Sequence, residues 1–579
     1  MKKRVKRLIA LLFAFIVPCS VFVCGGAAKA NDNKVIELNI YNAEEYISEY
    51  ESEWGTFDII EAFEEKMKKE GLNVKVNYST FGTLENMYNE LQLTKKKGKD
   101  GKYTYAYDLV CPSDYMIQRM INEDMLETYD VNFDDNGDVV YDKIDNFNEY
   151  ASGFIKDLFN SKNEQDYVTK ETKKWSEYAV CYMWGTMGFV YNPEKLLEVN
   201  ADKNIDISSM NGVELEEALE ANTWHLPWEA YYKNLGTIKD SIRDTYALAV
   251  GNVYSEQLIK LRQMWESGKL TQSEYQSVLI KVFNNVNTKF SEEFAEIKEL
   301  SPDKYSEVCK LFPDSDKKTV DKVSETLKVL KHNVFGFEVD SGKKDMASGK
   351  IAINFAWSGD AAYTLDTADE MEGATLYYSV PKEGSNIWFD AWVMPKGANK
   401  ELAQKFVNFI SSPDCAISNM DYIGYVSPIA GDDVFDRLLE TYELTTDEAE
   451  ANELGYVPID YSYYFTNISD EYKTEDGKVI VYTSTDNLGR QLTTQYPEKS
   501  TVDRCAIMTT LSKGELKDLN KMWSDVKVGD IPVWLLILIP SIIGVVAISF
   551  IIYAILKKHG VTFMRKPKYY GKLIKSERI

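Results

Sequence analysis

The hydrophobic and polar positions near the start of the chain follow two different periods. Within 35–40 apolar and polar residues alternate, which is typical of a half-buried strand. Ile59, Ile60, Phe63 and Met67 then recur at helical spacing. Continued along the chain, the pattern predicts strand, helix, strand, helix, strand and helix at 35–40, 59–67, 73–78, 84–93, 107–110 and 115–125. That order indicates an α/β sheet, in which ligands gather at the carboxyl ends of the strands.

The later part of the chain continues this pattern around a helical stretch. Residues 255–332 are charged and helical in pattern, without a strand signal, so we interpret them as a helical insertion. Strands are predicted at 351–355 and 391–394. A helix is predicted at 511–526, directly before an apolar segment.

Apolar segments stand near both ends of the sequence. The first follows a basic start and precedes the small-residue sequence Ala-Lys-Ala, so we expect a secretory signal peptide over 1–30. Residues 531–556 carry no charge, and at about 1.5 Å per residue they would span a hydrocarbon core of about 30 Å. The basic residues of 557–579 would place that tail in the cytoplasm. We therefore expect a single-pass protein of the cell membrane, held by its C-terminal helix with the binding domain outside the cytoplasm.

Composition narrows the classes of partner. The formal net charge is −25, and it becomes more negative when the two basic ends are left out. No nucleic acid is therefore expected as a partner, whereas a cationic ligand is plausible. The three histidines do not stand at metal-ligand spacing, so neither a metal nor another cofactor is expected. Two of the seven cysteines lie in the predicted signal peptide; the others are predicted to be buried free thiols, with a disulfide pair left open.

Six short phrases carry a family resemblance. They are Tyr-Asn-Ala-Glu-Glu-Tyr-Ile at 41–47, Asn-Tyr-Ser-Thr-Phe-Gly at 77–82, Tyr-Asp-Leu-Val-Cys-Pro-Ser-Asp-Tyr-Met at 107–116, Tyr-Met-Trp-Gly-Thr-Met-Gly at 182–188, Ile-Trp-Phe-Asp at 387–390 and Ile-Gly-Tyr-Val-Ser-Pro at 423–428. In this order they closely resemble the periplasmic spermidine/putrescine-binding protein family of polyamine ABC transporters. The resemblance covers residues 35 to about 430.

The resemblance implies an α/β fold of the two-lobed periplasmic-binding-protein type II, with a central cleft that clasps the ligand. Lobe 1 would comprise 31–188 with 391–432, and lobe 2 would comprise 189–390 with 433–529. The helical insertion 255–332 would belong to lobe 2.

The resemblance also implies which residues bind the ligand. They are Tyr46, Ser113, Tyr115, Asp244, Trp357, Trp388, Asp390 and Tyr425. A polyamine is a chain of methylenes that carries ammonium groups, so its site requires carboxylates for the charges and aromatic faces along the methylenes. Asp390 and Trp388 match the ammonium-binding carboxylate and its neighbouring wall.

Two positions depart from the family pattern. Ala43 stands where the family has its first cleft tryptophan. In the phrase Lys-Asp-Ser-Ile-Arg-Asp at 239–244, only Asp244 falls where a carboxylate is expected, and Asp240 would take its place if the register differs by one. The family's final C-terminal polar contact also has no match near Met508, so putrescine and spermidine both stay open as the preferred ligand.

The function implied is the substrate-binding component of an ABC importer, which delivers a polyamine to membrane permease subunits that work with an ATPase on the inner side. No enzymatic activity is expected, because no pair of carboxylates stands out as a glycosidase acid and base, and no phosphate-binding loop, serine nucleophile or metal-ligand cluster appears. Two alternatives are a binding protein of the same fold for another small solute and a membrane-tethered polyamine sensor without a transport role. An amino-acid ligand would require an arginine for its carboxylate, and the cleft loops offer no obvious one.

Overall fold

The computed structural model describes residues 35–528, apart from 53, 54, 100, 168 and 200–204, together with 541, 548 and 549. The predicted signal peptide at 1–30 and the predicted basic tail at 557–579 lie outside the described residues.

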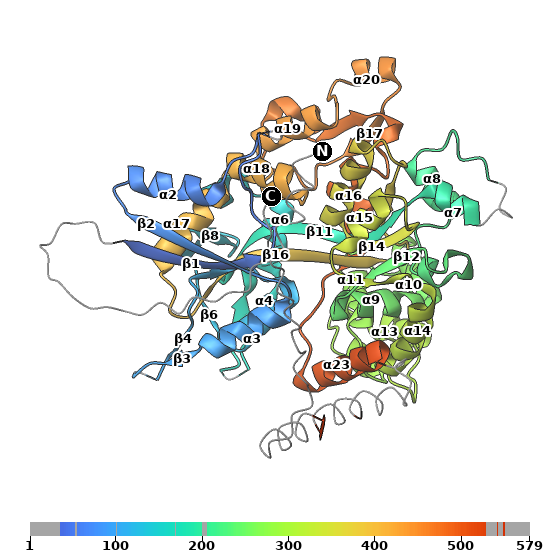
Figure 1. The fold of residues 1–579 in the computed structure, drawn as a ribbon, viewed down its shortest axis with the longest axis horizontal. Coiled ribbons are helices and arrows are strands. Elements are labelled where there is room, and N and C mark those ends of the chain that lie inside the picture. Colours follow the sequence, from blue (N-terminus) through green and yellow to red (C-terminus); the bar gives the residue numbers. More distant parts are fainter. Residues whose placement is uncertain are drawn as a thin grey trace, which may run out of the picture.

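One mixed sheet runs through the whole molecule (Figure 1). Its main path is, in order, β13 (Gly336–Glu338), β12 (Gly236–Lys239), β14 (Ile353–Trp357), β11 (Ala179–Tyr191), β16 (Ser385–Pro395), β5 (Leu109–Val110), β1 (Ile36–Ala43) and β2 (Val74–Phe81). The three strands at each end of this path are parallel, while β11 and β16 are antiparallel to each other and to their outer neighbours. The sheet therefore consists of two parallel blocks joined by a central antiparallel pair.

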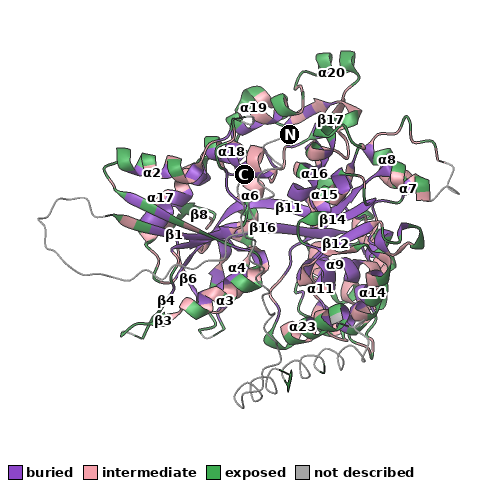
Figure 2. Cartoon of the chain, viewed as in Figure 1, coloured by how far each residue is buried: buried purple, intermediate pink, exposed green. Residues whose placement is uncertain are grey.

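The central pair carries the connection between the two halves. In Figure 1, β11 and β16 extend from the blue half of the molecule into the green and yellow half. All residues of β11 are buried, and both strands lie in the purple centre of Figure 2. The register places Trp388 opposite Gly185 and Asp390 opposite Met183, with an irregularity between Cys181 and Met183. The carboxyl end of β14 thus lies against β11, and that of β5 lies against β16, the strand that contains the Trp-Phe-Asp phrase.

Helices cover the first block as the sequence predicts. They are α2 (Ile59–Lys69), α3 (Leu84–Thr94), α4 (Asp114–Asn122), α17 (Lys400–Ile410) and α18 (Pro413–Ile423). The predicted order of strands and helices from 35 to 125 is confirmed. The third helix ends at Asn122, short of the predicted 125, because Asp124 has a φ of 54°, which is left-handed and stops the helix. Strand β16 begins at Ser385, well before the predicted 391.

The second block is covered by a larger set of helices. They are α9 (Ile242–Val253), α10 (Ser255–Glu266), α11 (Gln272–Phe283), α12 (Phe290–Phe294), α13 (Pro302–Leu311), α14 (Thr319–Asn333), α15 (Ser341–Ala347) and α16 (Ser358–Glu370). Helices α10 to α14 occupy the stretch 255–332. Helix α14 packs against α9 and against α23 (Lys513–Val528), which matches the helix predicted at 511–526.

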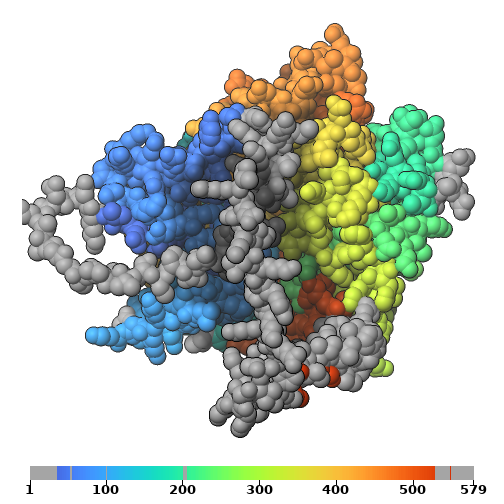
Figure 3. Space-filling model, in the orientation of Figure 1, coloured from blue at the N-terminus to red at the C-terminus, as the bar shows by residue number. Residues whose placement is uncertain are grey.

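The segment after α18 crosses one side of the molecule, in orange at the top of Figure 3. It contains α19 (Asp432–Thr441), α20 (Glu448–Leu454), β17 (Val457–Asp460), β18 (Ile480–Thr483), α21 (Gln491–Gln495) and α22 (Lys499–Asp503). The remaining short elements are β3 (Lys96–Lys97), β4 (Tyr103–Thr104), β6 (Leu126–Glu127), β7 (Val131–Phe133), β8 (Val139–Tyr141), α5 (Asp145–Tyr150), α6 (Gly153–Ser161), β9 (Asn163–Gln165), β10 (Thr172–Lys174), α7 (Pro193–Val199), α8 (Gly212–Ala218), β15 (Tyr377–Ser379) and β19 (Cys505–Ala506).

The predicted membrane anchor is corrected. Among the described helices, none has both the length and the apolar character needed to cross a bilayer. Helix α23, the last long one described, carries charged residues along its length, including Glu515, Asp518 and Lys521. The range 531–556 lies outside the described residues apart from 541, 548 and 549. Because the described residues contain no helix able to cross a bilayer, the predicted transmembrane helix and the single-pass membrane localisation that depends on it are withdrawn.

The five cysteines that follow the predicted signal peptide are all free thiols. Cys111, Cys181, Cys415 and Cys505 are buried, and Cys309 is partly exposed. The prediction of free thiols is confirmed, although Cys309 is not fully buried.

Candidate binding site

Asp390 lies at the centre of the candidate site, on the strand that joins the two halves of the molecule. The hydroxyl of Tyr46 donates a hydrogen bond of 2.7 Å to Oδ2 of Asp390. The backbone of Ser113 forms an isolated antiparallel bridge with the backbone of Asp390. Oδ1 of Asp390 is buried and has no hydrogen-bond partner among the described residues. An acceptor left without a donor in a buried position is costly, so this atom favours a ligand that brings a donor.

Burial is the largest influence on the Asp390 carboxyl. It raises the pKa of Asp390 to about 6, although hydrogen bonds from Ser113 and Tyr46 act in the opposite direction. The neighbouring Asp244 carboxylate adds to the rise. Among the described residues, no lysine, arginine or histidine forms an ion pair with Asp390. At neutral pH this carboxylate is therefore ionised and lacks a counter-ion, which is the condition that an ammonium ligand would relieve.

Tyr46, whose hydroxyl bonds to Asp390, belongs to a group of three aromatic rings. The ring of Tyr425 lies 5.4 Å from that of Tyr46 and 5.5 Å from that of Trp388, in edge-to-face arrangements. We call Tyr46, Ser113, Trp388, Asp390 and Tyr425 the Asp390 cluster. The rings of Trp388 and Tyr425 are seated on glycines, since a Cβ on Gly185 would clash with Trp388 and a Cβ on Gly359 would clash with Tyr425. Aromatic faces of this kind cover methylenes and attract ammonium groups.

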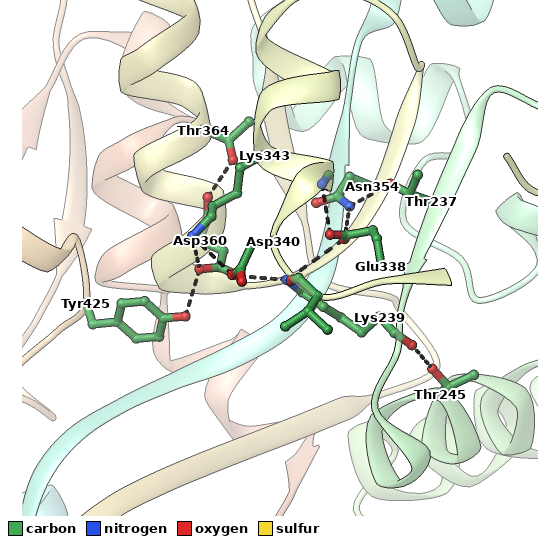
Figure 4. A network of polar contacts seen from close by, with 12 residues as sticks. Thr237, Lys239, Thr245, Glu338, Asp340, Lys343, Asn354, Asp360, Thr364 and Tyr425 are labelled. Carbon is green, nitrogen blue, oxygen red and sulfur yellow. Dashed lines mark hydrogen bonds and ion pairs between the residues drawn. The ribbon is translucent and has the colours of Figure 1, made fainter. Parts of the chain in front are cut away.

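A second group of residues adjoins the first at the carboxyl ends of β12 and β14 (Figure 4). Lys239 ends β12, Trp357 ends β14, and Asp360 lies in the first turn of α16. The Nζ of Lys239 lies 2.7 Å from Oδ2 of Asp360 and 4.5 Å from the centre of the Trp357 ring. We call these three residues the Lys239 cluster. It is joined to the Asp390 cluster by Tyr425, whose hydroxyl donates a hydrogen bond of 3.0 Å to Oδ1 of Asp360.

Asp360 differs electrostatically from Asp390. Burial raises the pKa of Asp360, but the ammonium groups of Lys239 and Lys343 outweigh it and lower the pKa to about 2. The Nζ of Lys343 lies 3.4 Å from Oδ1. Asp360 is therefore an ionised carboxylate that already has its cations.

A third group lies at the start of α9. The guanidinium carbon of Arg243 lies 4.8 Å from the centre of the Tyr115 ring, and the next residue is Asp244, which is 8% exposed. Burial raises the pKa of Asp244 to about 6, with Arg243 and Lys239 among the influences that lower it. Asp114 is also buried here, and burial raises its pKa well above the usual range, which favours its neutral form. No ion pair to Asp244 occurs among the described residues.

The eight residues predicted from the sequence fall into these three adjoining groups. Tyr46, Ser113, Trp388, Asp390 and Tyr425 form the Asp390 cluster, Trp357 belongs to the Lys239 cluster, and Tyr115 and Asp244 lie near Arg243. Asp240, the alternative to Asp244, forms an ion pair with Lys527 of α23.

Sequence reasoning missed three charged residues of this region. Lys239 and Arg243 lie in the same Lys-Asp-Ser-Ile-Arg-Asp phrase that includes Asp244, but the phrase by itself does not show that they belong to the site. Asp360 follows Trp357 by three residues in Trp-Ser-Gly-Asp, where a strand passes into a helix. A carboxylate at that turn, at the carboxyl end of a parallel strand, is the signal that could have identified it.

A separate cavity of about 1090 Å³ lies between the later turns of α16, α18, α19 and α21. Its lining includes Asp366, Arg437, Tyr442 and Arg490 and none of the eight predicted residues. Of the eight candidate residues, Tyr46, Asp244 and Trp388 are buried, and the other five are partly exposed.

Comparison with known proteins adds the family. The sequence profile described as bacterial extracellular solute-binding protein matches residues 58–433, which is more than half of the chain. The chain belongs to this family. It is 26% identical over 403 residues to the spermidine/putrescine-binding periplasmic protein of Salmonella typhimurium, covering 69% of this chain and 80% of that protein. It is 25% identical over 428 residues to the putrescine-binding periplasmic protein SpuD of Pseudomonas aeruginosa, covering 73% and 84%.

Several solved structures align over most of the chain. A putative spermidine/putrescine ABC transporter protein from Listeria monocytogenes aligns with a TM-score of 0.47 at 21% identity, over 85% of this chain and 98% of that one. As a member of the family, the chain is a solute-binding protein.

Proposed function

We propose that this solute-binding protein binds a polyamine, spermidine or putrescine, between its two lobes and delivers it to the permease of an ABC importer whose ATPase works on the inner side of the membrane. The relatives named above are spermidine/putrescine-binding or putrescine-binding proteins. The alignments cover 80% and 84% of their lengths. The lobes in this proposal are 31–188 with 391–432 and 189–390 with 433–529. The chain acts as a binding component and carries out no reaction of its own.

The observation that carries the proposal is the state of Asp390. Its Oδ1 is buried without a hydrogen-bond partner among the described residues, and its Oδ2 accepts from Tyr46, whose ring lies in one aromatic group with those of Tyr425 and Trp388. An ammonium group satisfies all three features at once, because it supplies charge, a hydrogen-bond donor and a cation for the rings. Neutral sugars supply only the donor. The proposed ligand residues are Tyr46, Ser113, Tyr115, Asp244, Trp357, Trp388, Asp390 and Tyr425.

Ligand-induced stabilisation of the purified full chain tests this proposal. A ligand that binds only the folded state adds RT ln(1 + [L]/Kd) to the free energy of unfolding, or about 2.7 kcal/mol at 100 times Kd. We expect putrescine or spermidine at millimolar concentration to raise the melting temperature, and maltose and glucose to leave it unchanged. Absence of a shift with putrescine, spermidine and spermine would refute the polyamine assignment.

A second candidate ligand class is favoured by one observation. Arg243 is 5% exposed, and its Nη1 has no hydrogen-bond partner among the described residues. A buried guanidinium with a free donor suits a carboxylate, so an amino acid is the alternative solute. The same melting experiment with a panel of amino acids distinguishes the two, since only one class should shift the transition.

A sensor without a transport role binds the same ligand. Uptake of radiolabelled polyamine by cells that contain or lack this chain separates the two roles. Loss of uptake in the deleted cells supports the importer, and unchanged uptake supports the sensor.

A further inference from the structure

Lys239 is an unusual residue to find at the edge of a cation-binding site. It is 1% exposed, and its Nζ is held by Asp360 at 2.7 Å and by the backbone oxygen of Val339 at 2.8 Å. The same Nζ lies 4.5 Å from the centre of the Trp357 ring. A carboxylate together with an aromatic face is the chemistry that recognises a ligand ammonium. At this position the chain supplies the ammonium itself.

Asp360, Asp390 and Asp244 differ in what is left for a ligand. Asp360 has Lys239 on Oδ2 and Lys343 on Oδ1. Asp390 and Asp244 have no ion pair among the described residues, and Oδ1 of Asp390 has no partner there at all. The pKa values agree with this division, since burial raises those of Asp390 and Asp244 to about 6 while cations lower that of Asp360 to about 2.

We propose that Lys239 is a resident cation that occupies one ammonium position of the cleft and restricts the ligand to two ammonium groups, which meet Asp390 and Asp244. This inference rests on the polyamine function proposed above. A diamine of the putrescine type matches the two carboxylates that lack counter-ions. The middle or far ammonium of a triamine such as spermidine would meet the ammonium of Lys239, and two like charges at close range in a buried site repel strongly.

The residue acts on specificity through charge and position together. Lys239 is fixed at the carboxyl end of β12, and its backbone oxygen accepts a hydrogen bond of 2.6 Å from the hydroxyl of Thr245. Its side chain therefore cannot leave without breaking the contacts to Asp360 and Val339. Lys343, by contrast, approaches Asp360 from a more exposed direction, with 23% of its side chain accessible.

Calorimetric Kd values of the full chain for putrescine and spermidine test the inference. We expect the unaltered protein to bind putrescine more tightly. Lys239→Met keeps most of the side-chain length, removes the ammonium and frees Oδ2 of Asp360 and the face of Trp357. The ratio of the two Kd values should then move toward spermidine by about tenfold. Adding Asp360→Asn to Lys239→Met should abolish that change, because the third carboxylate is gone.

Two further variants keep the test decisive. Lys239→Gln removes the charge but retains a donor toward Val339 and Asp360, so it replaces Lys239→Met if the latter does not fold. Lys173→Met is the matched control, since Lys173 is another buried lysine, with its Nζ 2.9 Å from Asp124 and 2.8 Å from Asp166, away from both clusters. It should lower the melting temperature and leave the Kd ratio unchanged.

The outcomes separate this inference from the function on which it rests. If the unaltered protein binds neither polyamine, the proposed function fails. A different result arises if the unaltered protein binds both polyamines and a folded Lys239→Met or Lys239→Gln variant keeps the ratio of the two Kd values within about twofold of the original. Lys239 is then a structural ion-pair partner, and the inference is overturned. An equal gain for both ligands overturns it as well, because a general obstruction does not depend on ligand charge.

Discussion

The phenolic oxygen of Tyr46 lies 2.7 Å from Oδ2 of Asp390, although 344 residues separate the two in the sequence. Tyr46 follows the first strand of the first parallel block, and Asp390 lies on the strand that joins the two blocks. The contact connects the first block to the joining strand. It also leaves Oδ1 as the oxygen available to a ligand.

Replacing Tyr46 by phenylalanine removes this donor and keeps the ring. Loss of one hydrogen bond to the charged form should weaken polyamine binding by about 1 to 2 kcal/mol, or roughly five- to thirtyfold. The apparent pKa that governs binding should rise, because the hydrogen bond from Tyr46 lowers the pKa of Asp390. Calorimetry at several pH values measures both effects. A lower affinity without a shifted pH profile would contradict the role given to the hydroxyl.

Asp390→Asn removes the charge at nearly constant shape. A buried ligand ammonium would then lose its partner, at about 2 to 5 kcal/mol, which corresponds to a loss of roughly thirtyfold to several thousandfold in affinity. The melting temperature without ligand should change little or increase, since an ionised and unpaired buried carboxylate contributes nothing favourable to the folded state. Asp135→Asn, at an exposed position, is the control and should bind normally. Unchanged affinity in Asp390→Asn would show that the ligand binds elsewhere.

Binding should strengthen as the pH rises from 5 to 7. The pKa values of Asp390 and Asp244 are raised from 3.8 to about 6, chiefly by burial, so both acids are mostly protonated at pH 5. A cationic ligand binds the ionised forms and therefore displaces protons. For folding alone the sign is opposite: the protonated folded state is favoured at low pH, and this contribution is lost as the pH rises through about 6. Calorimetry in buffers of different ionisation enthalpy should detect proton release near pH 5.5, and Asp390→Asn should reduce it.

Gly359→Ala should disturb the site through Tyr425. The added Cβ would clash with the Tyr425 ring, so the ring or the start of α16 must move. Overpacking of this kind costs about 1 to 3 kcal/mol of stability, and displacement of the ring should also weaken ligand binding. Gly336→Ala is the control, because a Cβ there meets nothing within 4 Å. Melting temperature and Kd, measured on both variants, check the prediction. Equal behaviour of the two variants would contradict it.

Local sequence is sufficient for the elements of the first block. The alternation in 35–40 and the helical spacing from Ile59 to Met67 correspond to β1 and α2, because each depends on residues only two to four positions apart. Strand β16 is longer than its local pattern predicts. Its first part contains Trp388 and Asp390, which interrupt a simple alternation of apolar and polar residues. This part is nevertheless a strand, because β11 pairs with it from Ile387 to Val393.

The family phrases are sufficient to name most of the candidate residues, because four of the six short phrases each contain one or two of them. The length and lack of charge of the C-terminal apolar segment predict a membrane helix, but the described residues contain no helix able to cross a bilayer. Asp390 can be named from its phrase, yet the absence of a counter-ion beside it among the described residues depends on every residue that approaches it.

The sequence by itself determined the α/β order of elements, the family and the residue types of a cation site. Only the tertiary structure decided which carboxylate is free and which is already paired. Lys239 and Asp360 are 121 positions apart, and Tyr46 and Asp390 are 344 apart. The charge state of a buried acid depends on its neighbours in space within a few ångströms, and the fold brings those neighbours together from strands that no local pattern connects.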